Sequence, residues 1–196
     1  MILKPLDMAK QIISSAIKKG DTVIDATLGN GHDALFLANC VGEKGFVVGF
    51  DVQEQAVSSA SIKLSKAGIE YMSFHQRGHE EMDQVMTELR TIDLLGYDVE
   101  SVGAIMFNLG YLPRADKAVI TTTETTLPAL ESSLRWLRKQ GVLTVMCYPG
   151  HAGGDIEAAA VKQWAAKLSR EIFRVIEYGY INAPNNPAFL VAVEKL

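Results

Sequence analysis

Runs of apolar and β-branched residues alternate with helical patterns along nearly the whole 196-residue chain. The expected strands are residues 22–26, 46–50, 71–75, 102–108, 142–148, 172–178 and 189–194. The expected helices are residues 8–18, 32–41, 53–67, 80–89, 123–138 and 156–170. The first five strands are continuous apolar runs, which is typical of parallel strands covered on both faces. The pattern therefore predicts an α/β fold with a doubly wound, mostly parallel sheet, in one domain spanning residues 1–196.

The turn after the first strand is the most informative segment. In a doubly wound sheet, ligands bind beyond the carboxyl ends of the strands. Gly29 and Gly31 allow the backbone to turn sharply and to approach a ligand closely, with Asn30 between them. The helix expected to begin at His32 offers unpaired N–H groups at its start. Residues 29–34 also fit the glycine pattern of dinucleotide-binding proteins.

Two acidic residues discriminate between the possible ligands of this turn. Asp25 precedes the turn and Asp33 follows it. Carboxylates here would repel the pyrophosphate of a dinucleotide, whereas they suit the amino group and the sulfonium of S-adenosylmethionine. The turn therefore favours S-adenosylmethionine as the ligand. A dinucleotide site and a purely structural glycine turn are the alternatives.

The rest of the expected donor site follows the second and third strands. Asp51 ends the second strand, where a carboxylate accepts hydrogen bonds from ribose hydroxyls. Gln53 is a candidate contact for ribose or adenine, or a bystander at the start of a helix. Gly78 and His79 follow the third strand and are expected to wall the adenine ring. The alternative for His79 is a helix-start residue without a ligand.

The turn after the fourth strand points to an amine as the methyl acceptor. It consists of Asn108, Leu109, Gly110 and Tyr111. The turn is related to the (Asn/Asp)-Pro-Pro-(Tyr/Phe) motif of amine-directed methyltransferases. In that motif the asparagine oxygen and a turn carbonyl accept hydrogen bonds from the amine, and the aromatic ring packs on the substrate base. Alignment of the two reactants supplies most of the acceleration in such a reaction.

Three further residues are candidates for binding the substrate. Arg114 and Lys117 follow the acceptor turn and could hold a phosphate, although cations in an exposed loop are commonly only solvated. His151 lies in a glycine-rich loop after the fifth strand. It could contact the substrate, accept a proton or orient the loop.

Composition narrows the classes of protein and of partner. The formal net charge of −4 argues against a broadly basic nucleic-acid-binding surface but allows a local basic patch. No apolar run reaches the roughly 18 residues that cross a bilayer, and residues 1–5 lack the apolar region of a secretory signal. We therefore expect a cytoplasmic protein with no membrane partner. The two cysteines lie far apart without a CxxC pair, so no metal site is expected.

Three segments taken together resemble one small bacterial family labelled as rRNA methylases. They are residues 25–33 (DATLGNGHD), 107–113 (FNLGYLP) and 148–154 (YPGHAGG), and the likeness extends over nearly the whole chain. Members of that family include tRNA 5-(aminomethyl)-2-thiouridine methyltransferases of Gram-positive bacteria. The resemblance implies the Rossmann-like class I methyltransferase fold, a mostly parallel seven-stranded sheet whose last strand is antiparallel.

The resemblance also implies an activity and a set of site residues. The activity is transfer of a methyl group from S-adenosylmethionine to the aminomethyl nitrogen of a modified wobble uridine, in the anticodon stem-loop of tRNA. The matching donor-site positions are Gly29, Asn30, Gly31, His32, Asp33, Asp51, Gln53, Gly78 and His79. Residues 108–111 are expected to face the acceptor, and Arg114 departs from the smaller residue expected in the family.

Other functions fit the same scaffold. The acceptor could be rRNA or a small-molecule amine, because the residues do not distinguish one RNA from another. A non-catalytic module that binds S-adenosylmethionine and RNA is a further alternative, although Asn108 argues against it. A homodimer is one way in which so short a domain could extend its RNA surface.

Overall fold

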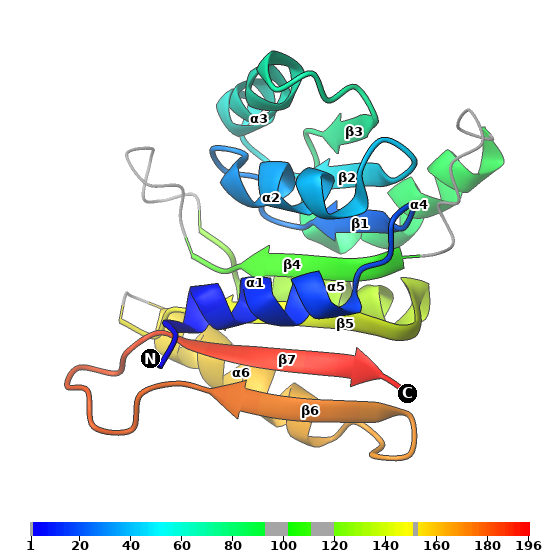
Figure 1. The fold of residues 1–196 in the computed structure, drawn as a ribbon. Helices are drawn as coiled ribbons and strands as arrows, with labels where there is room; N and C mark the ends of the chain where they lie inside the picture. Colours follow the sequence, from blue (N-terminus) through cyan, green and yellow to red (C-terminus); the bar gives the residue numbers. More distant parts are fainter. Residues whose placement is uncertain (1, 93–101, 111–119, 151–152) are drawn as a thin grey trace.

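The structure is a computed structural model that describes residues 2–92, 102–110, 120–150 and 153–196. Its strands are β1 (Thr22–Asp25), β2 (Phe46–Phe50), β3 (Met72–His75), β4 (Val102–Asn108), β5 (Leu137–Cys147), β6 (Phe173–Tyr178) and β7 (Phe189–Lys195). Its helices are α1 (Pro5–Ala16), α2 (His32–Val41), α3 (Glu54–Lys66), η1 (His79–Glu81), α4 (Met82–Thr91), α5 (Thr123–Trp136) and α6 (Gly154–Ala166). Figure 1 shows how these elements are arranged around the sheet.

The seven strands form one sheet in the order β3-β2-β1-β4-β5-β7-β6. The pairs from β3 to β5 are all parallel, and β7 runs antiparallel to both β5 and β6. The order reverses between β1 and β4, which places a crevice for a ligand beyond the carboxyl ends of these strands. The structure confirms the predicted fold class, including the antiparallel last strand.

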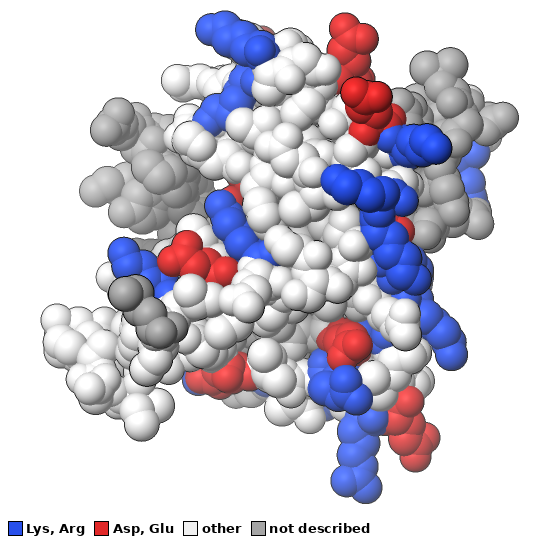
Figure 2. Space-filling view, in the orientation of Figure 1, with Lys and Arg blue, Asp and Glu red and all other residues white. Residues whose placement is uncertain are grey.

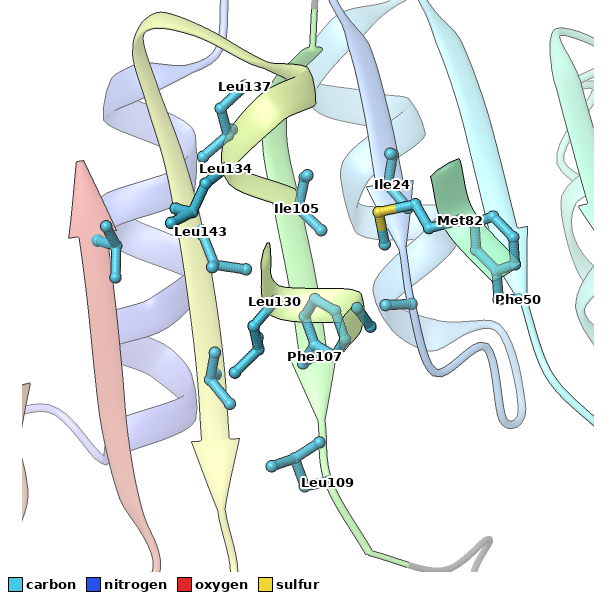
Figure 3. Close-up of a cluster of buried hydrophobic side chains, with 14 of the residues drawn as sticks. Ile24, Phe50, Met82, Ile105, Phe107, Leu109, Leu130, Leu134, Leu137 and Leu143 are labelled. Carbon is cyan, nitrogen blue, oxygen red and sulfur yellow. The ribbon is translucent and has the colours of Figure 1, made fainter. Parts of the chain in front are cut away.

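Three apolar clusters lie on the two faces of the sheet, one on the first face and two on the other. Helices α4, α5 and α6 bury their apolar side chains on one face, where Ile24, Ile105 and Phe107 point from the strands (Figure 3). Helices α2 and α3 cover the other face, and α1 packs there against β4, β5 and β7. β1, β2, β4 and β5 are buried almost throughout because helices cover both of their faces.

Several helix ends lie up to four residues from the sequence-based expectation, and two further differences concern the sheet. β3 is half-buried along its whole length because it lies at the edge of the sheet and pairs only with β2. Helix α5 ends at Trp136 instead of continuing to residue 138, and β5 begins already at Leu137, which pairs with Val102.

Arg138 explains the early start of β5. Its guanidinium donates to both carboxylate oxygens of Asp21, at 3.0 and 2.6 Å, and to the carbonyl oxygen of Ala16 at 2.8 Å. The paired side chains of Arg138 and Asp21 are only 13% and 6% exposed. A buried ion pair with so many hydrogen bonds is costly to break. Residue 138 is therefore held in the strand, and a helical pattern in the sequence does not reveal this contact.

None of the helices in the described ranges is long and apolar enough to cross a membrane.

Candidate active site

One cavity of about 770 Å³ lies at the carboxyl ends of β1, β2, β4 and β5. Most of the predicted site residues line it, namely Gly29, Asn30, His32, Asp33, Asp51, Gln53, Gly78, His79, Asn108, Leu109 and Gly110. Asp25 and Gly31 lie outside the lining. Four other predicted residues, Tyr111, Arg114, Lys117 and His151, fall outside the described part of the chain. The cavity therefore brings the expected donor turn and the expected acceptor turn together.

The glycines of the β1–α2 turn have different tasks. Gly29 lines the cavity with a left-handed φ of 48°, and its N–H donates to Asp51 Oδ2 at 3.0 Å. Gly31 also has a left-handed φ of 71°, but it faces helix α3, where an added Cβ would lie 2.6 Å from the Cα of Ala60. The sequence pattern correctly identified a backbone position that requires glycine. Gly31 is needed for the close approach of helix α3, and it does not line the cavity.

Asp51 uses half of its hydrogen-bond acceptor positions to hold backbone N–H groups. Its Oδ2 accepts the N–H of Gly29, and its Oδ1 accepts the N–H of Gln53 at 3.0 Å. An ionised carboxylate has about four acceptor positions, so each oxygen keeps one more. Asp51 is half-buried and lines the cavity, which leaves these positions for two neighbouring hydroxyl groups. This chemistry fits the ribose of a nucleoside.

Asp25 does not act as a free carboxylate at the cavity. It is fully buried at the end of β1, where Oδ1 accepts the N–H of Thr27 at 3.1 Å and Oδ2 meets no donor with full hydrogen-bond geometry among the described residues. Burial raises the pKa of Asp25 to about 8, and the negative charge of Asp33 adds to this effect. The side chain is therefore mostly protonated at neutral pH. The attraction for a cation that the sequence suggested at Asp25 is thus weak.

Asp33 is engaged with the protein on two sides. Its Oδ1 lies 2.8 Å from the ammonium of Lys10, and its Oδ2 accepts a hydrogen bond from Nδ2 of Asn108. Lys10 lies in α1, far in sequence from the turn after β4 and outside the turn after β1. The ion pair compensates the charge that was expected to attract a sulfonium. Asp33 instead links the donor turn to the acceptor turn.

Asn108 is held by groups from three other segments. Its N–H donates to Thr27 Oγ1 at 2.8 Å, its Nδ2 donates to Asp33, and its Oδ1 accepts the hydroxyl of Tyr148 at 3.2 Å. Tyr148 follows β5 and also lines the cavity. The amide is therefore immobilised at the end of β4 in one orientation.

The acceptor turn is braced from the opposite face of the sheet. Gly110 and Thr121 exchange two hydrogen bonds, since the N–H of Gly110 donates to Thr121 Oγ1 at 2.8 Å and the N–H of Thr121 donates to the Gly110 carbonyl at 3.1 Å. Thr121 Oγ1 donates in turn to the buried carboxylate of Glu157 in α6 at 2.9 Å. Thr126 donates to the other oxygen of Glu157 at 2.6 Å. Position 110 is thereby fixed relative to the helices.

His79 is a neutral, buried wall of the cavity. Its Nδ1 lies 3.3 Å from the carbonyl oxygen of Ala26, so this nitrogen carries the proton and donates. Burial lowers the pKa of His79, which keeps the ring uncharged. The ring meets Phe107 edge-on at 5.4 Å. His79 therefore supplies an uncharged, rigid surface.

His32 and Gly78 complete the predicted donor residues. The ammonium of Lys63 lies 3.0 Å from the ring nitrogens of the exposed His32. A Cβ at Gly78 would lie 2.2 Å from the carboxylate of Glu80, which also lines the cavity.

Sequence reasoning missed Lys10, Tyr148, Thr121 and Glu157 as parts of the site. Tyr148 is the last residue of a predicted strand, at the edge where ligands bind, so its position was a usable signal. Lys10 and Glu157 lie within helical patterns, where nothing marks a long-range contact.

Known proteins are similar to this chain in fold and in sequence. The family model described as "Putative rRNA methylase" matches residues 47–194, and that of protein-L-isoaspartate(D-aspartate) O-methyltransferase matches residues 2–84, less than half of the chain. The chloroplastic tRNA (mnm(5)s(2)U34)-methyltransferase of Arabidopsis thaliana is 31% identical over 201 residues, which cover 98% of this chain and 70% of the relative.

Two solved structures are similar over 100% of both chains, each at 36% identity. One is a "putative rRNA-methylase" from Clostridium thermocellum, with a TM-score of 0.90. The other is a "putative methyltransferase" from Streptococcus mutans in complex with SAH, with a TM-score of 0.85. Since the first family model matches more than half of the chain and the Arabidopsis relative is similar over nearly all of it, the chain belongs to this rRNA methylase family.

Proposed function

We propose that this chain is an S-adenosylmethionine-dependent methyltransferase whose acceptor is an amine of tRNA. The observation that carries the proposal is one cavity lined by both Asp51 and Asn108. The carboxylate of Asp51 suits a ribose, and the amide oxygen of Asn108 suits an amine. Membership of the methylase family and the SAH complex of the similar Streptococcus mutans protein support the choice of donor. Residues 1–196 act as a single domain in this proposal.

The donor half of the cavity suits S-adenosylmethionine. Asp51 accepts hydrogen bonds from the ribose hydroxyl groups, and Gln53 lies beside it at the start of α3. Gly78 and His79 form an uncharged wall for adenine, and Gly29 and Asn30 bring the backbone close to the ligand. When bound, S-adenosylmethionine supplies an activated methyl group on a sulfonium sulfur. Asp33 contributes here by positioning its neighbours, because Lys10 compensates its charge.

The acceptor half suits a neutral amine. Asn108 Oδ1 accepts an N–H of the amine, which directs the nitrogen lone pair toward the methyl group. The amine must be uncharged to react, and partial burial of the cavity favours loss of its proton. Leu109 and Gly110 line the same space and carry no charge. Tyr111 is proposed to pack on the substrate base, and His151 to contact the substrate.

We propose the aminomethyl nitrogen of 5-aminomethyl-2-thiouridine, at the wobble position of the tRNA anticodon stem-loop, as the acceptor. The name of the Arabidopsis relative, a tRNA (mnm(5)s(2)U34)-methyltransferase, supports this choice. Arg114 and Lys117 are proposed to hold phosphates beside the acceptor turn. The proposed location is the cytoplasm, although that relative is chloroplastic by name, and a homodimer is proposed to extend the RNA surface.

A local basic surface is compatible with an RNA partner. Lys and Arg side chains gather along the right-hand edge of Figure 2, which is the side where β1 and β4 begin in Figure 1. Exposed lysines at this end of the sheet are Lys18, Lys19, Lys44 and Lys139. This is the end of the sheet opposite to the cavity, so an RNA would have to extend around the protein to bring phosphates to these lysines, and such contacts weaken as salt is added.

A methyl-transfer assay tests the proposal. The protein is incubated with methyl-labelled S-adenosylmethionine and tRNA from cells that lack this activity, and the tRNA is digested to nucleosides. We expect label in a single wobble nucleoside, and no label in tRNA from cells in which the position is already methylated. Label in rRNA or in a small amine would identify a different acceptor. Binding of SAH without transfer to any fraction would indicate a non-catalytic module.

A further inference from the structure

Tyr148 is a cavity residue with a specific contact to the proposed acceptor ligand. It follows β5 directly, it is half-buried, and its hydroxyl donates to Oδ1 of Asn108 at 3.2 Å. A carboxamide oxygen has two lone pairs, so one remains for a second donor. The contact therefore leaves Asn108 able to accept an N–H of a substrate.

The opposite end of the same amide is also held. Nδ2 of Asn108 donates to the carboxylate of Asp33, which the ammonium of Lys10 contacts at 2.8 Å. An ionised carboxylate only accepts hydrogen bonds, so the NH2 group of Asn108 must face Asp33 and its oxygen must face Tyr148. The contact to Asp33 thus specifies one of the two possible flip states of the amide, and the hydroxyl of Tyr148 then donates to the oxygen.

We propose that Tyr148 is a positioning residue that, together with Asp33, holds the amide of Asn108 with its oxygen toward the acceptor amine. The inference rests on the proposed function, because it assigns Tyr148 a part in that same methyl transfer. Without the hydroxyl, the Asn108 amide keeps its contact to Asp33 but loses the hydrogen bond that restrains its oxygen. The nitrogen lone pair of the substrate would then be aligned with the methyl group in a smaller fraction of encounters.

The phenol of Tyr148 stays a donor over the working pH range. Burial raises its pKa above the ordinary value, and the negative charge of Asp33 raises it further. The hydrogen bond to Asn108 therefore does not depend on pH near neutrality. This constancy distinguishes a positioning role from a proton-accepting role, which would give a pH-dependent kcat.

The substitution Tyr148→Phe removes the hydroxyl and keeps the ring. Tyr178→Phe is the matched control, because Tyr178 is also half-buried and its hydroxyl also makes one hydrogen bond, to the carbonyl of Leu3 at 2.8 Å, away from the cavity. We expect Tyr148→Phe to lower kcat for tRNA methylation about threefold to tenfold, the worth of one neutral hydrogen bond. The KM for S-adenosylmethionine and the shape of the pH profile should not change. Tyr178→Phe should leave kcat unaltered.

A double-mutant cycle shows whether Tyr148 acts through Asn108. In the Asn108→Ala background, Tyr148→Phe should cause no further loss of kcat, because the group that it positions is gone. An equal loss in both backgrounds, or an unchanged kcat in the single variant, would overturn the assignment.

A measurement without turnover separates this inference from the proposed function. In protein labelled with 15N-asparagine, the side-chain amide signal of Asn108 is identified by its loss in Asn108→Ala. We expect that signal to shift in Tyr148→Phe and to stay in place in Tyr178→Phe, and an unmoved signal in both would refute the contact. Failure of the wild-type protein to methylate tRNA, with the shift present, would refute the acceptor and the catalytic part of the inference but leave the contact standing.

Discussion

Removal of the Asp51 carboxylate tests the donor site most directly. The structure commits one acceptor position of each oxygen to the N–H groups of Gly29 and Gln53, which leaves one per oxygen for the ribose. A hydrogen bond to a charged group contributes about 1.5 to 3 kcal/mol. Loss of one such bond, with the second replaced by water, raises the Kd by about tenfold to 150-fold. We therefore expect Asp51→Ala to weaken binding of SAH within that range.

Isothermal titration calorimetry with SAH measures this effect without an RNA substrate. Glu54→Ala is the matched control, because it removes the same charge from an exposed position three residues further along the chain that does not line the cavity. Thermal unfolding of both variants checks that the protein stays folded when the N–H groups of Gly29 and Gln53 lose their contacts to Asp51. A folded Asp51→Ala protein whose Kd lies within about threefold of the wild type would refute the ribose assignment.

Three other predictions concern the turns and the buried acid. Gly31→Ala should lower the Tm more than Gly68→Ala, because both glycines have a left-handed φ but only Gly31 faces the Cα of Ala60; equal losses in thermal unfolding would contradict the packing argument. Asn108→Ala should reduce kcat at least about 100-fold while the Kd for SAH, measured by calorimetry, stays near the wild-type value. The pKa of Asp25 is about 8 in the folded protein, above its value in the unfolded chain, so as pH rises Asp25 ionises first in the unfolded chain. The free energy of unfolding therefore falls by up to about 1.4 kcal/mol per pH unit as pH rises from 5 to 7. Denaturant unfolding should show a smaller fall for Asp25→Asn, and an identical fall would mean that Asp25 ionises normally.

Local patterns were sufficient to predict the sheet and most of its helices. Strand and helix periodicities depend on neighbouring residues, and α2, β2 and β4 have the predicted bounds because each is buried by its own apolar pattern. The start of β5 was missed because it depends on Arg138 reaching Asp21. That contact joins residues 117 positions apart, so no local window contains it.

The positions of the site residues were more predictable than the charge states of their side chains. Turns at strand ends must meet at one edge of a parallel sheet, so Gly29, Asp51 and Asn108 were expected near one another. The electrostatic argument from Asp25 and Asp33 was less successful. A sequence does not show that burial protonates one of these acids or that Lys10 compensates the other.

The contacts of Asp33 give the two halves of the cavity a common support. Asp33 belongs to the helix that begins at the donor turn, yet its carboxylate orients Asn108 of the acceptor turn and anchors Lys10 of α1. A donor that moves the start of α2 on binding would therefore also move the amide that we propose receives the substrate amine. Donor and acceptor alignment then depend on the same carboxylate, as methyl transfer requires, because the reaction rate is set by the geometry between the two ligands.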